Sequence, residues 1–467
     1  MQKLSPLNIK ENVAEALSDD SLKKAVLNAT LSSLDSREKI IEEIPYWEEL
    51  RQKTNNIKAD LINNLDTYLE IFEKNSTTNG INVHWAKDDV SARNIILKIA
   101  SDNNVKKIVK SKSLTTEEIH LNDALIEKGI ETLETDLGEY IVQLKEQVPS
   151  HLIIPALHLS KEDVGELFTE KLGTEYTSVP EELLLVARKN IREKFLQADM
   201  GISGSNFAIA ESGSFVIVEN EANAHLTITL PKIHVAVIGI EKLIPNMETL
   251  PYFLKLLAPS ATGQKSSTYV NFVGGPSRNK YGEGPDEVHV VLVDNGRSRV
   301  LKNQQLRETL QCIRCGACLN SCPVYQQIGG HAYGWVYMGP IGATLAPQYL
   351  GTHEGKYSPY LCTLCGECYN VCPVKINLPE HLLTLRKQIV KDGESKKVES
   401  AAMKAWSFVA SRPKLYDLLT TIPAVMQKML PEGKSFSVPG YGKERPLPPF
   451  DKLGFKKRFE KEKKNEK

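Results

Sequence analysis

The sequence predicts an α/β domain that is followed by a small, mainly helical, cysteine-rich domain. Expected helices and strands alternate between about residues 85 and 300, which is the rhythm of an α/β fold. All eight cysteines of the 467-residue chain lie between Cys312 and Cys372. Because the cysteines are confined to this one stretch, they indicate a binding site and not a set of disulfides that ties distant loops together.

The first 69 residues are expected to form a helical region. Apolar side chains recur at helical spacing in 61–72, so one face of this helix should pack on the domain that follows. The α/β pattern then begins with expected helices at 90–103 and 115–128 and expected strands at 107–109 and 130–133. This order predicts a sheet whose strands are joined by helices.

A run of strands is expected in the second half of the α/β domain. Four β-rich segments follow one another, at 206–210, 214–219, 225–230 and 233–240. They predict a β-meander or a pair of hairpins that is inserted into the domain. Two further strands, at 268–273 and 288–293, should close the domain around a glycine-rich connection.

The cysteines form an internal repeat. Residues 312–323 read CIRCGACLNSCP and residues 362–373 read CTLCGECYNVCP. Both copies have the spacing C-x2-C-x2-C-x3-C-P, by which bacterial ferredoxins bind [4Fe-4S] clusters. Three cysteines two residues apart can curl a loop around one face of a cluster, and the glycine after the second cysteine lets backbone N–H groups approach the sulfides. The repeat therefore predicts two [4Fe-4S] clusters in a ferredoxin-type domain.

The fourth cysteine of each run is expected to ligate the other cluster, as in two-cluster ferredoxins. The predicted ligands of the first cluster are therefore Cys312, Cys315, Cys318 and Cys372. The predicted ligands of the second cluster are Cys362, Cys365, Cys368 and Cys322. The alternative is a pair of zinc sites, which is disfavoured because a third cysteine at the same short spacing would crowd a tetrahedral metal.

The balance of charge excludes several classes of partner. Lys and Arg together number 58, as do Asp and Glu, so no global field favours nucleic acid or a membrane surface. The N-terminal residues lack the apolar run of a secretory signal, and apolar runs such as 234–240 are far shorter than the ~20 residues that span a bilayer. We therefore expect a cytoplasmic protein without a transmembrane segment.

No nucleotide-binding motif is visible in the α/β domain. The glycine-rich residues 201–206 follow a long helix and lead into a strand, which reverses the order of a dinucleotide site. Removal of two electrons from an organic substrate needs a two-electron acceptor, whereas each cluster normally carries one electron. The chain is therefore not expected to complete such an oxidation alone.

For Glu211, for three histidines and for the aromatic residues between the cysteine runs, a structural role is favoured over a functional one. Glu211 lies in an expected turn between strands, where hairpin-turn chemistry is favoured over a pocket for an anionic or acyl ligand. His158, His225 and His234 have no partner spacing that would mark a catalytic group, so we expect them to be structural. The aromatic residues between the two cysteine runs are favoured as packing residues over a direct role in electron transfer.

Several stretches resemble the LutB family of iron-sulfur proteins of lactate utilization. They are residues 112–119 (KSLTTEEI), 134–144 (ETDLGEYIVQL), 155–158 (PALH) and 201–213 (GISGSNFAIAESG), followed by the doubled cysteine run. The resemblance spans nearly the whole chain, and all eight cysteines of the family pattern are present.

The resemblance implies a domain organisation. Residues 70–296 would form a LUD α/β domain that resembles the NagB/RpiA/CoA-transferase-like fold. A two-cluster ferredoxin-type domain would occupy 300–390, after the helical region 1–69 and the LUD domain, and a family-specific tail would occupy 395–467. The resemblance supplies no catalytic residues for the LUD domain, so these remain unknown.

The resemblance also implies a function. Proteins of this family act with LutA, which carries cysteine-rich CCG domains, and with LutC, a second LUD protein, to oxidise L-lactate to pyruvate in bacteria. This chain would then be the electron-transfer subunit of an NAD-independent L-lactate dehydrogenase complex that allows growth on lactate, with an unknown electron acceptor.

Two other hypotheses stay open. In the first, the LUD domain is itself an enzyme that acts on another hydroxy acid or on an acyl or sugar-acid ligand, and the clusters are structural or sensory. In the second, the chain is a metal-stabilised interaction protein whose clusters are redox-silent.

Overall fold

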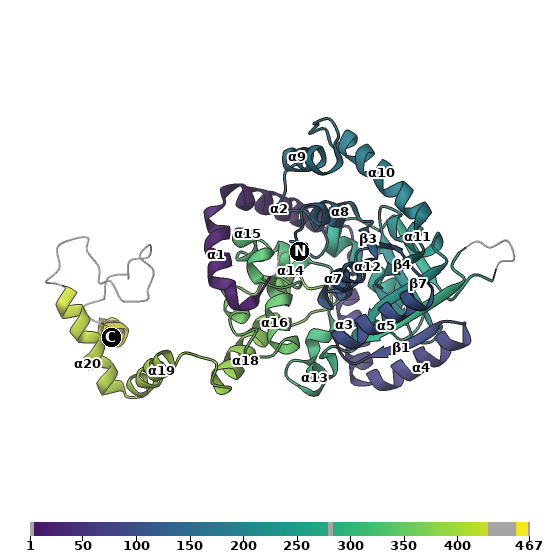
Figure 1. Cartoon of the computed structure of the whole chain (residues 1–467). Coiled ribbons are helices and arrows are strands. Elements are labelled where there is room, and N and C mark those ends of the chain that lie inside the picture. The colour runs from purple at the N-terminus through teal and green to yellow at the C-terminus, as the bar shows by residue number, and fades with distance from the viewer. Residues whose placement is uncertain (1–3, 279–283, 428–453, 466–467) are drawn as a thin grey trace. The chain divides into compact units, whose positions relative to one another are not determined.

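The chain folds into two units, which are described separately. The computed structural model describes residues 4–278, 284–427 and 454–465 (Figure 1). The larger unit is Met1–Asp392 and the smaller unit is Gly393–Lys467. Within the predicted C-terminal tail, residues 428–453 lie outside the described residues.

Four helices form the N-terminal part of the larger unit. They are α1 (Ile9–Ser18), α2 (Asp20–Glu42), α3 (Trp47–Asn63) and α4 (Leu65–Thr78). Asp19 caps α2, because its side chain accepts a hydrogen bond from the backbone N–H of Leu22. These residues are helical, as predicted, and the last helix runs past residue 69. The proposed domain boundary at this position stays a prediction.

A six-stranded parallel sheet forms the centre of the α/β region. Its strand order is β1 (Asn82–Ala86), β10 (Glu287–Val293), β7 (Ile233–Gly239), β4 (Met200–Ser203), β2 (Lys107–Lys110) and β3 (Glu131–Glu134). Every residue of β7 is buried. Val235 and Val237 face one apolar cluster and Ala236 and Ile238 face another, so both faces of the sheet are covered.

Helices cover the sheet. One face packs on α5 (Asp89–Asp102) and α7 (Leu121–Glu127). A separate apolar cluster joins α8 (Leu137–Leu144), α9 (Lys161–Leu172) and α10 (Pro180–Gln197). The expected helix at 115–128 is divided, because α6 (Leu114–Glu118) ends before His120, whose φ of 51° is left-handed.

The α/β region also contains a second sheet, which has four strands. Its order is β8 (Leu243–Ile244), β5 (Phe207–Ile209), β6 (Ser214–Glu219) and β9 (Tyr269–Val273), and α12 (Leu250–Thr262) follows β8. β5 and β6 form the expected hairpin. Its turn is held by α4, because Ser76 Oγ donates to the Gly213 carbonyl at 3.0 Å, while the Glu211 side chain is exposed. This arrangement fits the hairpin-turn interpretation of Glu211.

The prediction of a strand at 225–230 is wrong, because these residues belong to helix α11 (Asn223–Thr229). The Glu219 carboxylate accepts hydrogen bonds from the first N–H groups of the helix, at 2.7 Å from Ala224 and 2.8 Å from His225. The helix lies directly on β4. A Cβ atom on Gly201 would come within 1.9 Å of the Thr227 carbonyl oxygen, so glycine at this position permits the close approach.

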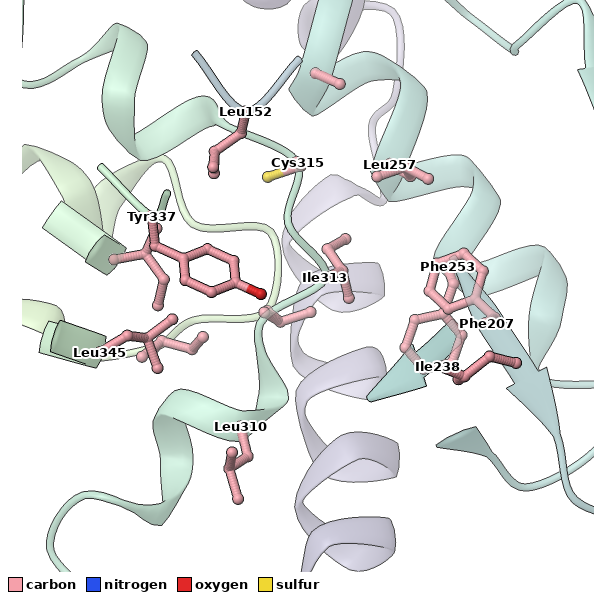
Figure 2. Close-up of a cluster of buried hydrophobic side chains, with 14 of the residues drawn as sticks. Leu152, Phe207, Ile238, Phe253, Leu257, Leu310, Ile313, Cys315, Tyr337 and Leu345 are labelled. Atoms are coloured by element: carbon pink, nitrogen blue, oxygen red, sulfur yellow. The ribbon is translucent and has the colours of Figure 1, made fainter. Parts of the chain in front are cut away.

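The cysteine region packs on the N-terminal helices and the second sheet. One apolar cluster contains Val26 of α2, Leu50 of α3, Phe207 of β5 and Leu345 of α16 (Gly339–Tyr349). Figure 2 shows Phe207 and Leu345 among its side chains. Further helices here are α13 (Arg297–Lys302), α14 (Ala317–Asn320), α15 (Tyr325–Ile328), α17 (Glu367–Asn370) and α18 (Leu378–Lys391). The N-terminal helices, the α/β region and the cysteine region of the larger unit therefore share one apolar core.

The smaller unit contains α19 (Lys397–Ala410), α20 (Pro413–Gln427) and α21 (Gly454–Asn465). Trp406 of α19 and Tyr416 of α20 pack edge to face, with ring centroids 6.0 Å apart. In the described part of the chain, no helix combines the length and the apolar character needed to cross a membrane.

Candidate iron-sulfur site

The two cysteine runs fold into loops with the same backbone conformation. The third residue of each run has a positive φ, which is 61° at Arg314 and 59° at Leu364. The glycine after the second cysteine is also left-handed, with φ of 79° at Gly316 and 91° at Gly366. Glycine adopts this conformation without steric cost. Each loop then leads into a one-turn helix, so the sequence repeat is also a structural repeat.

Backbone N–H groups point at cysteine sulfurs in both loops. The third residue of each run donates to the sulfur of the first cysteine, at 3.4 Å for Cys312 and 3.2 Å for Cys362. After the second run, the N–H of Ile376 donates to Cys372 at 3.3 Å. Such N–H···S bonds favour thiolates and are one means by which proteins tune cluster potentials.

The last cysteine of the second run lies with the first three cysteines of the first run. One small cavity is lined by Cys312, Cys315, Cys318 and Cys372. Apolar side chains complete its wall, and Figure 2 places the Cys315 sulfur beside Leu152. The structure therefore brings together the four cysteines that the sequence assigned to the first cluster.

The other four cysteines form a second neighbourhood. Burial raises the pKa of the Cys322 thiol, and nearby Cys362 and Cys365 raise it further. Burial likewise raises the pKa of Cys368 to about 12, with Cys362 and Cys322 as its strongest thiol neighbours. Cys322 of the first run thus lies near the first three cysteines of the second run, and their assignment to one cluster stays a prediction.

The cysteine environments fit clusters better than free thiols. All eight cysteines are free of disulfides. Burial raises the pKa of Cys372 to about 11 and raises that of Cys318 well above its usual range. Bare thiolates would therefore be costly here, whereas iron ions supply the positive charge that stabilises them. The first group of four sulfurs has an apolar surround, and both groups receive backbone N–H donors, which fits the donor set of a [4Fe-4S] cluster.

The two loops differ in exposure. In the first loop, Ile313 and Arg314 are buried. In the second loop, Cys365 is exposed and Leu364 is 38% exposed, so this loop meets solvent. The first neighbourhood thus lies inside the larger unit, and the second lies near its surface.

Two arginines from the N-terminal helices hold the backbone around Cys372. Arg37 of α2 donates from Nη2 to the Val371 carbonyl at 3.0 Å. Arg51 of α3 donates to the Cys372 carbonyl from Nε at 3.0 Å and from Nη2 at 2.8 Å. Neither arginine is predictable from the sequence, because 334 and 321 residues separate them from their partners and no local spacing signals the contact.

A buried ion network joins the first cysteine loop to the main sheet. Arg297 donates to both oxygens of Glu118 at 2.8 and 2.9 Å, and from Nε to Glu241 at 2.5 Å. The other oxygen of Glu241 lies 3.5 Å from Nη2 of Arg314. Tyr337 donates to Glu118 at 2.7 Å, and the Arg314 guanidinium lies 4.7 Å from the Tyr337 ring centroid. Burial alone raises the pKa of Glu241, but Arg297 and Arg314 lower it to about 2, so this carboxylate is ionised.

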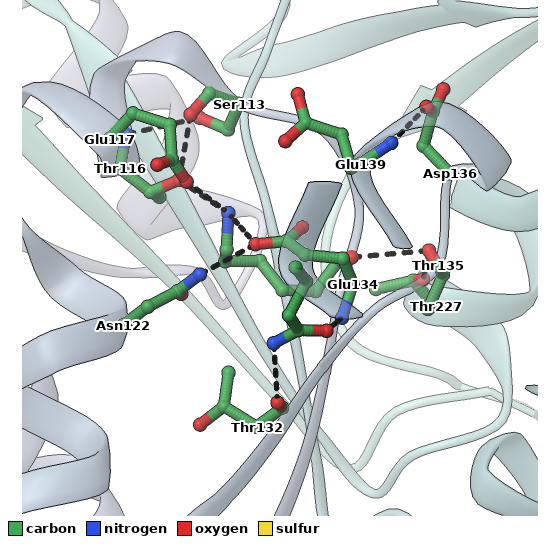
Figure 3. A network of polar contacts seen from close by, with 12 residues as sticks. Ser113, Thr116, Glu117, Asn122, Thr132, Glu134, Thr135, Asp136, Glu139 and Thr227 are labelled. Carbon is green, nitrogen blue, oxygen red and sulfur yellow. Dashed lines mark hydrogen bonds and ion pairs between the residues drawn. The ribbon is translucent and has the colours of Figure 1, made fainter. Parts of the chain in front are cut away.

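A second buried network lies where β2 and β3 end. Lys110 Nζ, at the end of β2, contacts Glu134 at 2.7 Å and Glu117 at 3.0 Å. Figure 3 shows Asn122 reaching the same Glu134 carboxylate, at 2.7 Å. Burial raises the pKa of Glu139 well above its usual range, and the neighbouring Glu134 and Glu117 raise it further. No local spacing in the sequence signals this network, because its members come from different elements.

Aromatic residues between the two cysteine runs lie in the core. Tyr333, Trp335 and Tyr337 are buried, and the rings of Trp335 and Tyr337 pack edge to face with centroids 5.0 Å apart. His331 donates to the Val148 carbonyl at 2.7 Å, and His158 contacts Ser150 Oγ at 2.8 Å. These residues therefore pack or form hydrogen bonds within the protein.

Family models match three consecutive parts of the chain. The model described as the LUD domain matches residues 69–293, and the 4Fe-4S dicluster domain matches residues 308–376. The C-terminal domain of lactate utilisation protein B matches residues 385–464. The chain therefore contains a LUD domain with a parallel-sheet α/β core and an iron-sulfur domain.

One solved structure is similar to part of the chain. It is a DUF162 family protein from Deinococcus radiodurans, 13% identical, which aligns over 49% of this chain and 98% of its own with a TM-score of 0.28. This likeness is too weak to assign the fold, so the NagB/RpiA-like fold stays a prediction.

Curated relatives match over nearly their whole lengths. The "Lactate utilization protein B" of Bacillus pumilus is 42% identical, and the alignment covers 99% of both chains. That of Macrococcus caseolyticus is 44% identical over 89% of this chain and 88% of its own. The "Uncharacterized electron transport protein YkgF" of Escherichia coli is 40% identical over 89% and 87% of the two chains. At this identity and coverage, the chain belongs to the lactate utilization protein B family.

Proposed function

We propose that this chain is the electron-transfer subunit of a cytoplasmic complex that oxidises L-lactate to pyruvate. The relatives that carry the name lactate utilization protein B support the substrate, and the relative named as an electron transport protein supports the role. The observation that carries the proposal is the pair of cysteine loops with matching backbone conformation, in which Cys372 lines one cavity with Cys312, Cys315 and Cys318.

In this proposal the chain holds two [4Fe-4S] clusters. Cys312, Cys315, Cys318 and Cys372 hold the first, and Cys362, Cys365, Cys368 and Cys322 hold the second. When bound, each cluster accepts and donates one electron at a time. Zinc is the weaker candidate, because each loop presents three closely spaced cysteines where a zinc ribbon presents two.

The two cysteine loops have different surroundings, which suit the two clusters to different partners. The first loop contacts the LUD domain through Arg314, whereas the second loop presents Cys365 and Leu364 to solvent. We assign the first cluster to the side of the organic substrate. We assign the second cluster to electron exchange with the external acceptor, because another protein can approach an exposed cluster more closely than a buried one.

Partners complete the two-electron step. Oxidation of a hydroxy acid removes two electrons, whereas each cluster carries one. We therefore propose that a LutA-like protein with CCG domains and a LutC-like LUD protein act with this chain. The competing proposal, in which the LUD domain alone is the enzyme, draws on the pocket at the edge of its main sheet.

Anaerobic reduction separates the two proposals. The purified chain with intact clusters is mixed with L-lactate, first alone and then with the LutA-like and LutC-like proteins, and cluster absorbance is recorded. We expect no bleaching by the chain alone and bleaching in the mixture, with D-lactate as the control substrate and dithionite to show that the clusters are reducible. Bleaching by the chain alone would favour the LUD-domain enzyme.

A further inference from the structure

A pocket of about 260 Å³ opens at the edge of the main sheet, where the strands end at their carboxyl ends. Its lining includes Ser113 after β2, Asp136 after β3, Ser205 after β4 and Lys242 after β7. In open α/β sheets, ligands bind in the crevice outside the carboxyl ends of the strands. At this volume the pocket lies below the usual range for drug-sized ligands, so it suits a small metabolite.

The cations that line this pocket have few ionic partners among the described residues. Lys242 lines the pocket and has no hydrogen bond or ion pair with any residue that the structure describes. Lys112 donates to the neutral Ile153 carbonyl. Arg314, the third lining cation, has one ionic contact within the described residues, the 3.5 Å approach to Glu241, which Arg297 already occupies at 2.5 Å.

The carboxylates that line the pocket are already committed to the protein. Glu219 accepts from two backbone N–H groups at the start of α11 and from Asn271 at 2.6 Å. Asp136 caps α8 by accepting from the Glu139 N–H at 3.0 Å. Glu221 accepts from the Leu137 N–H at 3.4 Å. These carboxylates therefore already have hydrogen-bond donors from the protein, whereas the Lys242 ammonium has no acceptor among the described residues.

We propose that this pocket binds a small organic carboxylate between Lys242 and Arg314. A guanidinium and an ammonium that converge in a partly desolvated pocket make charge-assisted hydrogen bonds to a carboxylate. Leu114, Leu152 and Ile153 form an apolar part of the wall, which favours an organic anion with a short carbon chain over phosphate.

The pocket adjoins the first cysteine loop. Arg314, which lines the pocket, also donates its backbone N–H to the Cys312 sulfur. Leu152 lines both this pocket and the cavity of the first four cysteines. A carboxylate bound here places negative charge beside the first cluster, and Coulomb repulsion then makes that cluster harder to reduce. Only the choice of L-lactate and pyruvate as the first carboxylates to test rests on the proposed function.

Calorimetric titration of the full chain with intact clusters tests the inference. The probes are L-lactate, pyruvate and propanoate, with lactamide as the uncharged control and inorganic phosphate as the competing anion. We expect the carboxylates to bind and lactamide and phosphate to bind much more weakly. Lys242→Gln should weaken carboxylate binding roughly tenfold or more, Lys242→Arg should retain most of it, and Lys87→Gln, at an exposed site, should change nothing.

The second measurement is the reduction potential of the first cluster. It includes the wild type, so it does not depend only on whether the Lys242 variant folds. The saturating carboxylate should lower the reduction potential of the first cluster in the wild type and leave it unchanged in Lys242→Gln. Equal binding by Lys242→Gln, or preference for phosphate, would overturn the carboxylate site while leaving the electron-transfer proposal intact. Carboxylate binding by a chain that holds no iron would support the carboxylate site and overturn the electron-transfer proposal.

Discussion

Arg51 donates two hydrogen bonds to the backbone carbonyl of Cys372, from Nε at 3.0 Å and from Nη2 at 2.8 Å. The arginine is buried on α3, and its remaining nitrogen pairs with Glu48 at 2.6 Å. An N-terminal helix thus fixes the one cysteine that must cross from the second run to the first neighbourhood. The cysteine motif alone does not contain this support.

Replacement of Arg51 should therefore damage the first cluster selectively. In Arg51→Met the Cys372 carbonyl loses both donors, and we expect the free energy of unfolding to fall by about 2 kcal/mol, as for hydrogen bonds to a charged group. Iron analysis and EPR should show partial loss of the first cluster with the second retained. Arg188→Met, at an exposed position of α10, is the control and should match the wild type. Equal loss of both clusters would contradict the selective role.

Ligand exchange between the runs predicts which cysteine variants behave alike. Cys372→Ser should remove the same EPR signal as Cys312→Ser, because both residues line one cavity. Cys322→Ser should remove the other signal, together with Cys362→Ser. If Cys372→Ser instead grouped with Cys362→Ser, each run would hold its own cluster and the assignment would be wrong.

His234 should make stability depend on pH in mild acid. Burial, and then the nearby His289, lower the pKa of His234 from 6.5 to about 3. Between these two values the unfolded chain binds more protons than the folded chain, so stability falls as the pH falls below about 6.5, by up to about 1.4 kcal/mol per pH unit. His234→Gln keeps a partner for Ser203 and should lose less stability than the wild type between about pH 6.5 and pH 5. Denaturant unfolding at about pH 6.5 and about pH 5 gives the free energy of unfolding of both proteins. An identical change with pH in the wild type and in His234→Gln would exclude the effect.

The contact between α11 and β4 predicts a sharp difference between two glycines. In Gly201→Ala the new methyl group would lie 1.9 Å from the Thr227 carbonyl oxygen, so α11 must move. We expect a loss of about 2 kcal/mol or more in the free energy of unfolding. Gly274→Ala is the matched control, since a Cβ there meets nothing within 4 Å. Comparable losses in both variants would mean that glycine flexibility, and not the helix contact, sets the cost.

Local signals in the sequence led to the prediction of the cysteine site, and the ligand sets of the two clusters stay a prediction. The spacing of the repeat determines which atoms can surround a cluster, and the structure groups Cys372 with Cys312 as the two-cluster pattern requires. The sequence also predicted the central strands β7 and β10, because both are mainly apolar and are buried on both faces of a parallel sheet, apart from the exposed Glu287 at the start of β10.

Tertiary contacts account for what the sequence did not reveal. The alternating, β-branched residues of 225–230 read as a strand, but capping by Glu219 and the space above Gly201 make them a helix. Arg37 and Arg51 lie in ordinary amphipathic helices, and only the folded chain brings them to Cys372. The carboxylate pocket combines loops from four strands with a cysteine loop, so no single stretch of sequence contains it.

The most direct test of the account is iron and sulfide analysis of the anaerobically purified chain, together with EPR after reduction by dithionite. Two [4Fe-4S] clusters predict about eight iron and about eight sulfide per chain, with two interacting S = 1/2 signals. Zinc in place of iron, or iron sufficient for only one cluster, would contradict the proposal that this chain conducts electrons through two clusters.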